Sequence, residues 1–401
     1  MTADKHQDYM YGLLKRVLDD IGPRPSCGSE EKALAELLRA EWEPICTRVD
    51  VEDFQCHPGA FLGAVHVYAV MYLAALALYM FVPLLSSTLL VIGAGVFFLE
   101  LVRYYELTDA LYPRARGENL LGIIEPEQKA TKRLIVCAHL DSAWEFNLFY
   151  WMGDAAVVGL ISSVLAYGVL FAAGVGATLT SPGMSVFFWM WVATAVFSPM
   201  MLLLFAFHTY SAVPGAMDDL AGIAVVAGLG RWIDSSGKNG QFKLQNTEVV
   251  LFAASAEEAG LRGSKRYVER HLKELKSLPT NVLVIDGVAD ENFLTVVTKE
   301  LWTGARHSPS LIKAIEEIAG EHQWPIKTMP IVMGGTDATP FSQNNIPAVI
   351  IGCQDLTRLV PNYHTRLDTI DHVSPQSMVV TLQVTIDLLR RLDTYRRTRT
   401  G

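Results

Sequence analysis

The stretch Thr247-Glu-Val-Val-Leu-Phe-Ala-Ala-Ser-Ala-Glu257-Glu258 joins an apolar run directly to two carboxylates. A short apolar run without helical spacing is typical of a strand that is buried on both faces. We therefore expect a strand over 247–254 that ends just before Glu257 and Glu258. The stretch Arg133-Leu-Ile-Val-Cys-Ala-His139 repeats this arrangement and predicts a second buried strand that ends at His139.

Strand patterns alternate with helical patterns along the polar parts of the chain. Further strands are expected over 118–124, 281–285, 293–298 and 348–352, and helical apolar spacing covers 9–21, 29–45, 263–275, 308–320 and 374–397. This alternation predicts an α/β fold with a mostly parallel mixed sheet sandwiched by helices. Sites in such folds lie at the carboxyl ends of the strands.

Residues of metal-ligand type fall at or just after these strand ends. They are His139, Asp218, Glu258, Asp286 and His364. Each alone has an ordinary structural explanation, such as a helix cap for Asp218 or a hydrogen-bonded loop histidine for His364. Together they have the types and the order that a two-metal site requires, because zinc binds imidazole nitrogen and carboxylate oxygen.

Two adjacent metals need one ligand that spans both, and Asp218 is the candidate bridge. Our hypothesis assigns one metal to His139, Asp218 and Asp286. The other metal is assigned to Asp218, Glu258 and His364.

Catalysis at such a site also requires a base that takes a proton from water and passes it to the leaving amine. Glu257 adjoins a proposed ligand without being one, so it is the candidate base. Asp141 is expected to hydrogen-bond the far nitrogen of His139 and to hold its tautomer.

Two long regions carry no Asp, Glu, Lys or Arg across their middles. Each is long enough for two membrane spans of about 20 residues. The expected spans are 61–82 and 84–102 in the first region, and 155–178 and 184–207 in the second. Apolar residues make up 51% of the chain and charged residues 19%, which agrees with a membrane protein.

We therefore expect a discontinuous domain that carries the candidate zinc ligands over 1–58, 104–150 and 209–401. Two transmembrane hairpins, 59–103 and 151–208, are inserted into it. Paired spans leave all polar parts on one side of the membrane. Basic residues flank the spans and the hairpin tips are uncharged, so the catalytic part is expected on the cytoplasmic side of a plasma or inner membrane.

The net charge of −9 and the absence of a long basic run argue against nucleic-acid binding. The N-terminus shows no apolar segment typical of a signal peptide. Five cysteines without a CxxC pair argue against a disulfide framework and favour a reducing compartment.

The set of motifs resembles the co-catalytic di-zinc aminopeptidases of peptidase clan MH, which include glutamate-carboxypeptidase-like and glutaminyl-cyclase-like members. The matching strings are His139-Leu-Asp141-Ser, Gly215-Ala-Met-Asp218-Asp219, Glu257-Glu258-Ala-Gly260-Leu-Arg-Gly263-Ser, Asp286, Thr336-Asp337 and His364-Thr-x-x-Asp368. The resemblance covers residues from about Asn119 onward. It implies two zinc ions per chain, with the ligand and base roles assigned above.

Two features depart from that family. The stretch from the first histidine to the bridging aspartate, a short loop in secreted relatives, here contains two spans. Family members often carry a Ser-Asp-His string, whereas this chain has Thr336-Asp337-Ala338. Asp337 is expected either to cap the helix that follows or to line the substrate pocket.

The leading hypothesis is a membrane-embedded aminopeptidase. Its substrates are peptides or amides with an apolar part, and its other contact is the lipid bilayer. A carboxypeptidase or a lipid-linked amidohydrolase on the same scaffold stays open, because sequence does not show whether Arg262, Arg306 or Arg358 reaches the cleft. More distant alternatives are a glutaminyl-cyclase-like transferase and a non-catalytic receptor. A homo-oligomer formed through the glycine-containing spans is also left open.

Overall fold

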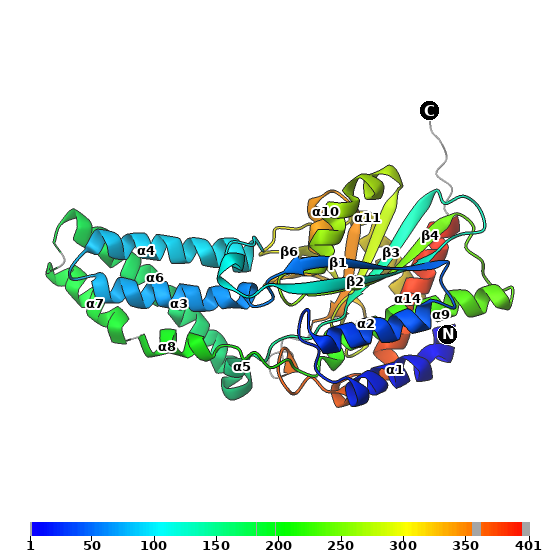
Figure 1. Cartoon of the computed structure of the whole chain (residues 1–401), viewed down its shortest axis with the longest axis horizontal. Coiled ribbons are helices and arrows are strands. Elements are labelled where there is room, and N and C mark those ends of the chain that lie inside the picture. The colour runs from blue at the N-terminus through cyan, green and yellow to red at the C-terminus, as the bar shows by residue number, and fades with distance from the viewer. Residues whose placement is uncertain (1, 182, 197, 355–361, 395–401) are drawn as a thin grey trace.

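A mixed β-sheet with helices packed on both faces forms the larger part of the molecule (Figure 1). The computed structural model describes residues 2–181, 183–196, 198–354 and 362–394. Among them, eight strands form one sheet in the order β1-β2-β4-β3-β5-β8-β6-β7. The strands are β1 (Arg48–Cys56), β2 (Ala115–Ile124), β3 (Lys132–His139), β4 (Thr247–Ala254), β5 (Thr280–Ile285), β6 (Leu294–Glu300), β7 (Lys327–Ile331) and β8 (Ala348–Cys353).

Helices cover the two faces of the sheet because successive strand residues point to opposite sides. Leu134, Val136 and Ala138 of β3 join one core cluster, while Ile135 and Cys137 join the other. The first face is covered by α1 (Gln7–Asp20), α2 (Ser29–Trp42), α9 (Ala221–Lys238), α11 (Pro309–His322) and α14 (Pro375–Thr394). The second is covered by α10 (Arg262–Ser277) and α12 (Ala338–Gln343). The predicted α/β sandwich is confirmed.

The strands that sequence patterns missed are the two at the edges of the sheet, β1 and β7. Edge strands need no continuous apolar run, because one side of each stays unpaired and solvated. β1 carries four charged residues in Arg48-Val-Asp-Val-Glu-Asp53, and β7 contains Pro330, which edge positions tolerate.

Apolar helices extend as a separate bundle from one end of the sheet (Figure 1). The first pair is α3 (Ala60–Leu78) and α4 (Pro83–Val96), which continues as η2 (Phe97–Val102). The second pair is α6 (Asp154–Leu179) and the segments α7 (Ser185–Val196), α8 (Ser198–Leu203) and η4 (Leu204–Ala206), preceded by α5 (Asn147–Met152).

Three of these helices are long and apolar enough to cross a membrane: Ala60–Leu78, Pro83–Val102 and Asp154–Leu179. The fourth expected span is bent by 42° between Ser185–Val196 and Ser198–Ala206. Length and composition thus agree with three of the expected spans. The fourth is a candidate span only if its two bent segments are taken together.

Both helical pairs pack into one bundle. Its core cluster includes Tyr68 and Tyr72 of α3 and Tyr167 and Leu170 of α6. Tyr72 donates a hydrogen bond to the carbonyl of Thr194 at 2.8 Å, so this buried hydroxyl finds a partner inside the bundle.

Chain direction explains where the bundle attaches. β1 runs antiparallel to β2, and β2 runs antiparallel to β4, so β1 ends at the same edge of the sheet as β4. β3 runs parallel to β4, and His139 pairs with Ala254 at that edge. The first hairpin follows β1 and the second follows β3. Both insertions therefore leave the sheet at the edge where the candidate ligands lie.

Candidate metal centre

The candidate ligands reach one place from separate elements. His139 is the last residue of β3, and Asp286 follows the end of β5. Glu258 lies in the turn between β4 and α10. Asp218 belongs to η5 (Ala216–Leu220), directly before α9, and His364 lies between β8 and α14. The carboxyl edge of the parallel strands thus gathers the expected residues.

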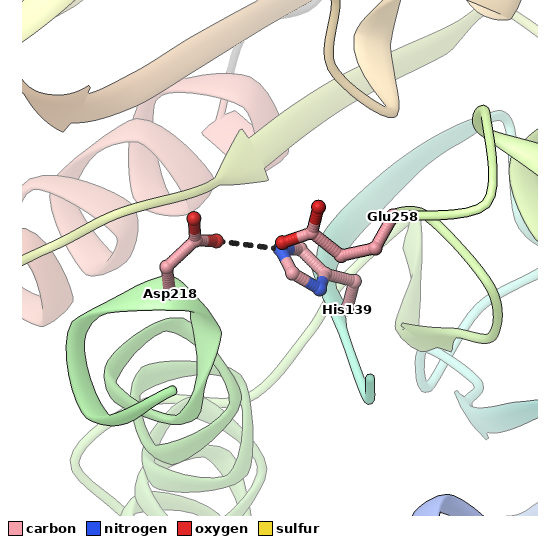
Figure 2. Close-up of side chains that lie close together, drawn as sticks. All are labelled: His139, Asp218 and Glu258. Carbon is pink, nitrogen blue, oxygen red and sulfur yellow. Dashed lines mark hydrogen bonds and ion pairs between the residues drawn. The ribbon is translucent and has the colours of Figure 1, made fainter. Parts of the chain in front are cut away.

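Asp218 is at the centre of the cluster. Its Oδ1 lies 3.0 Å from Nε2 of His139, and its Oδ2 lies 3.2 Å from Nε2 of His364. Glu258 Oε1 lies 3.2 Å from the same His364 nitrogen. Ligand atoms of His139, Asp218 and Glu258 all lie within 4.8 Å of one another, and Figure 2 shows these three side chains converging. Each oxygen of Asp218 therefore faces a different histidine.

Asp286 approaches this cluster without a direct hydrogen bond to it. Burial, reinforced by the charge of Asp218, raises the pKa of Asp286 to about 7. The charges of His139, Asp337 and Glu258 also act on this carboxyl, but the group of ligand atoms within 4.8 Å of one another contains only His139, Asp218 and Glu258.

Charges in the cluster are strongly coupled because the cluster is buried. Burial opposes ionisation of Asp218, but hydrogen bonds from His139 and His364 outweigh it and lower the pKa of this carboxyl. Burial disfavours a protonated His364, yet Glu258 and Asp218 raise its pKa to about 10. Protonated imidazoles thus balance the carboxylates here. A divalent cation supplies the same compensation when the imidazoles are neutral.

Two further aspartates hold the backbone around Asp218. The carboxylate of Asp219 accepts hydrogen bonds from the N–H groups of His139 at 3.1 Å and Gly222 at 3.2 Å. The carboxylate of Asp368 accepts from the N–H groups of Met217 at 2.7 Å and Asp218 at 3.2 Å. The bond to Gly222 shows that the helix-capping role falls to Asp219, which leaves Asp218 free to face the histidines.

Asp141 contacts the far nitrogen of His139, as expected, and does so chiefly through its main chain. His139 Nδ1 lies 3.0 Å from the backbone carbonyl of Asp141 and 3.4 Å from its carboxylate. The carboxylate instead accepts hydrogen bonds from the N–H groups of Glu257 and Glu258, both at 3.1 Å. Asp141 therefore orients His139 mainly through its main chain. Its side chain holds the turn of Glu257 and Glu258, here called the catalytic turn.

The segment 22–26, between the helices α1 and α2, also supports the site. Arg24 is fully buried and donates hydrogen bonds to the carbonyls of Leu140 at 2.9 Å and Gly215 at 3.0 Å. Ser26 donates to the Asp141 carboxylate at 2.6 Å. A lone arginine between prolines carries no sequence signal for this role, because its partners are backbone carbonyls far away in the chain.

Glu257 is buried beside the ligands, and burial raises the pKa of its carboxyl well above the usual range. A carboxyl with a raised pKa accepts and returns a proton more readily near neutral pH.

The hairpin residue Phe61 packs against the turn that carries Glu257 and Glu258. A Cβ at Gly260 would be 3.1 Å from the Phe61 ring.

Asp337 does not cap the helix that follows it. Its side chain makes no capping hydrogen bond at the start of α12, although the residue is only 1% exposed. Its Oδ2 lies 3.9 Å from Sγ of Cys137, two residues before His139 in β3. The expectation of a cap was therefore wrong.

Both insertions contact the loops that carry the candidate site. Arg262, four residues beyond Glu258, is bidentate to Asp109 in the segment that returns from the first hairpin. On the other side, the ring of Phe146 meets His364 edge-on at 4.5 Å between centroids. Arg366 pairs with Glu145, with its Nε 2.6 Å from Oε1.

The donor set fits zinc. Imidazole nitrogens and carboxylate oxygens are the ligands that zinc takes in hydrolytic sites. His139 ends β3 and Asp286 follows β5, and the backbone N–H groups of Glu258, His139 and Asp218 donate to the carboxylates of Asp141, Asp219 and Asp368 respectively. A supported ligand set of this kind is typical of a metal centre.

Comparison with known proteins agrees with this chemistry. Residues 199–389 match the model of peptidase family M28. The match includes Asp218, Glu258, Asp286 and His364, whereas His139 lies before it and rests on geometry. A comparison with curated protein sequences finds no match.

Solved structures share the fold at low identity. The zinc aminopeptidase BSAP from Bacillus subtilis is 15% identical, with 98% of this chain and 96% of that chain covered and a TM-score of 0.57. The LapA aminopeptidase of Legionella pneumophila is 14% identical, with 98% and 74% covered and a TM-score of 0.56. A glutaminyl cyclase from an Acidobacteriales bacterium is 11% identical, with 97% and 94% covered and a TM-score of 0.58. The family match and the zinc aminopeptidase neighbours support a zinc-dependent hydrolase.

Proposed function

We propose that the chain is a membrane-embedded metallopeptidase with two zinc ions, which removes N-terminal residues from peptides or amides with an apolar part. The observation that carries the two-zinc proposal is the placement of Asp218, whose two oxygens face His139 and His364 separately. A carboxylate placed in this way suits a bridging ligand.

We divide the proposed zinc ligands into two sets that share Asp218. His139, Asp218 and Asp286 would hold the first zinc, and Asp218, Glu258 and His364 would hold the second. Bound zinc lowers the pKa of water and polarises the substrate carbonyl. Glu257 takes the proton of the attacking water and gives it to the leaving amine, and burial tunes its pKa for both transfers.

Charge around the site favours an aminopeptidase over a carboxypeptidase. Arg262 is bidentate to Asp109, and Arg366 is paired with Glu145. Arg306 is exposed to solvent, and Arg358 lies outside the described residues. These arginines are thus paired or exposed where they are described, while Glu257 and Asp337 are buried carboxylates outside the proposed ligand set. A substrate ammonium is favoured there over a substrate carboxylate.

Both hairpins are attached at the edge of the sheet where the candidate ligands lie, and this supports a substrate cleft that faces the bilayer. Each hairpin leaves the sheet where the ligands lie, and its flanking segments touch the catalytic turn or the His364 loop. A substrate that partitions into the membrane reaches such a cleft without crossing the aqueous face of the domain. We place the catalytic domain on the cytoplasmic side, since the basic flanks of the spans lie with it.

The experiment compares hydrolysis of a soluble aminoacyl amide with that of an aminoacyl amide carrying an acyl chain. The enzyme is the purified full-length chain in lipid nanodiscs. The acyl-chain substrate should have the higher kcat/KM. Glu257→Gln should lower kcat by at least about a hundredfold. It should retain two zinc ions by inductively coupled plasma mass spectrometry.

Glu274→Gln, on the outer part of α10, is the matched control and should keep wild-type activity. An active Glu257→Gln variant would remove the base assignment. Equal kcat/KM for the two amides would remove the bilayer-facing cleft.

A glutaminyl-cyclase activity is the second candidate, because structures of two such enzymes are among the neighbours. Peptides with an N-terminal glutamine distinguish the two. A cyclase releases ammonia and leaves the peptide bond intact, whereas an aminopeptidase releases free glutamine.

A further inference from the structure

Two cysteines that are far apart in the chain meet behind the candidate site. Sγ of Cys27 lies 2.8 Å from Sγ of Cys56, across a separation of 29 residues. Both are free thiols in the structure. This separation is shorter than the usual contact between unbonded thiols and lies between that contact and the length of a disulfide bond, about 2.05 Å.

Backbone interactions hold both cysteines in place without help from their thiols. Cys27 has a positive φ of 62° in the turn after Pro25, and its N–H donates to Glu31 Oε2 at 2.6 Å. Cys56 is the last residue of β1 and pairs with Ala115 of β2. The pair is thus preorganised, and closing the bond requires only a small movement of the sulfur atoms.

Packing connects this pair to the turn that carries Glu257 and Glu258. The thiols belong to a small apolar cluster with Phe54, Ala256 and Ala259. Ala256 directly precedes Glu257, and Ala259 directly follows Glu258. Glu31 adds a second link, because its Oε1 accepts from the N–H of Ala256 at 2.8 Å while its Oε2 accepts from Cys27.

The residues that follow or precede the two cysteines in the chain connect the pair to the catalytic turn and to the first hairpin. Ser26, next to Cys27, donates to the Asp141 carboxylate that holds the turn. Cys56 lies four residues before the first residue of α3, Ala60. A covalent bond at this point would join the support of the catalytic turn to the start of the first hairpin.

We propose that Cys27 and Cys56 form a redox-active pair that closes into a disulfide on exposure to a disulfide oxidant and thereby stabilises the support of the Glu257–Glu258 turn. With glutathione disulfide, the Cys27 thiolate attacks one sulfur and forms a mixed disulfide, and one glutathione thiolate leaves. The Cys56 thiol, losing its proton, then attacks the Cys27 sulfur and expels the second glutathione. The two protein thiols are oxidised, and one glutathione disulfide is reduced to two thiols.

Burial makes exchange at this pair slow in both directions. The contact with Cys56, burial and the charge of Glu31 raise the pKa of the Cys27 thiol. A high thiol pKa leaves little attacking thiolate and also makes the thiol a poor leaving group. The bond should therefore form over hours and, once formed, resist mild reduction.

The test uses the full-length chain in detergent, held overnight either in glutathione disulfide or in dithiothreitol. Each sample is then unfolded, alkylated with iodoacetamide and digested without reductant. The oxidised sample should yield a peptide linked through Cys27 and Cys56, lighter than its two free parts by a pair of hydrogen atoms. Before unfolding, the apparent Tm of the oxidised chain should be higher than that of the reduced chain by roughly 5 °C, since the bond closes a long loop.

Two variants complete the test. Cys27→Ser should lose both the linked peptide and the rise in Tm. Cys46→Ser, which alters a half-buried cysteine outside the pair, should keep both. Full alkylation of Cys27 and Cys56 after oxidation, or linkage of either to another cysteine, would overturn the proposal. A rise in Tm that persists in Cys27→Ser would do the same.

Discussion

Arg262 donates two hydrogen bonds to the carboxylate of Asp109, at 3.0 and 2.7 Å. Arg262 opens α10, directly after the turn of Glu257 and Glu258, and is 1% exposed. Asp109 lies in the segment that returns from the first hairpin to the sheet. This pair is therefore a direct connection between the hairpin and the catalytic turn.

Removing that connection should lower stability. In Asp109→Asn the arginine keeps Glu106 at 2.7 Å but loses its bidentate partner, so the free energy of unfolding should fall by about 1–3 kcal/mol. The apparent Tm of the purified chain measures the change. Asp234→Asn removes the half-buried partner of the exposed Lys238 and should change the free energy by less than about 0.5 kcal/mol. An equal effect of both variants would contradict a structural role for the Arg262 pair.

The zinc content should respond differently to two carboxylates of the site. Asp286→Asn removes a proposed ligand of the first zinc only, so one zinc per chain should remain. Asp218→Asn removes the proposed bridge, and both zinc ions should be lost or much weakened. Metal analysis after dialysis measures both, with Glu257→Gln as the variant that keeps two. Retention of two zinc ions in Asp286→Asn would remove this residue from the ligand set.

Acid should weaken the contact between the second insertion and the His364 loop. Hydrogen bonds from Arg366 lower the pKa of the Glu145 carboxyl. A carboxyl whose pKa is lowered on folding stabilises the folded state above its unfolded pKa, and this contribution disappears as the pH falls through the folded pKa. The apparent Tm of the wild type should therefore fall more steeply below pH 5 than that of Glu145→Gln. Parallel curves would show that the pair contributes nothing to stability.

A pair of glycines in α4 offers a matched test of the bundle. A Cβ at Gly93 would lie 2.1 Å from Oη of Tyr167, whereas a Cβ at Gly95 meets nothing within 4 Å. Both changes to alanine gain about 1 kcal/mol of helix propensity. Gly93→Ala should nevertheless lower the apparent Tm in detergent, because α4 and α6 must separate, while Gly95→Ala should not. A stable Gly93→Ala variant would contradict the packing of α4 on α6.

Sequence patterns predicted the centre of the sheet better than its edges. The central strands β3, β4, β5 and β8 are buried on both faces, so their apolar runs are visible in the chain. The edge strands β1 and β7 carry charges or proline and leave no such run. His139, Glu258 and Asp286 were predictable for the same reason, because they lie at or just after the ends of β3, β4 and β5.

The supports of the site were less predictable. Arg24, Asp219 and Asp368 act through backbone groups, and a backbone carbonyl or N–H has no signature in a sequence. Asp141 shows the limit clearly, since its contact with the far nitrogen of His139 was expected, whereas the hydrogen bonds that its carboxylate accepts from the N–H groups of Glu257 and Glu258 were not.

By itself the sequence determined the chemistry that is available: the metal-ligand residue types, their order, and the apolar segments between the first two ligands. These are local properties, set by residue type and spacing along the chain. Only the tertiary structure decided that Asp218 faces two histidines, that both insertions leave from the site edge, and that Cys27 meets Cys56. Such relationships join residues that are distant in sequence, so they depend on how strand directions and packed faces bring the segments together.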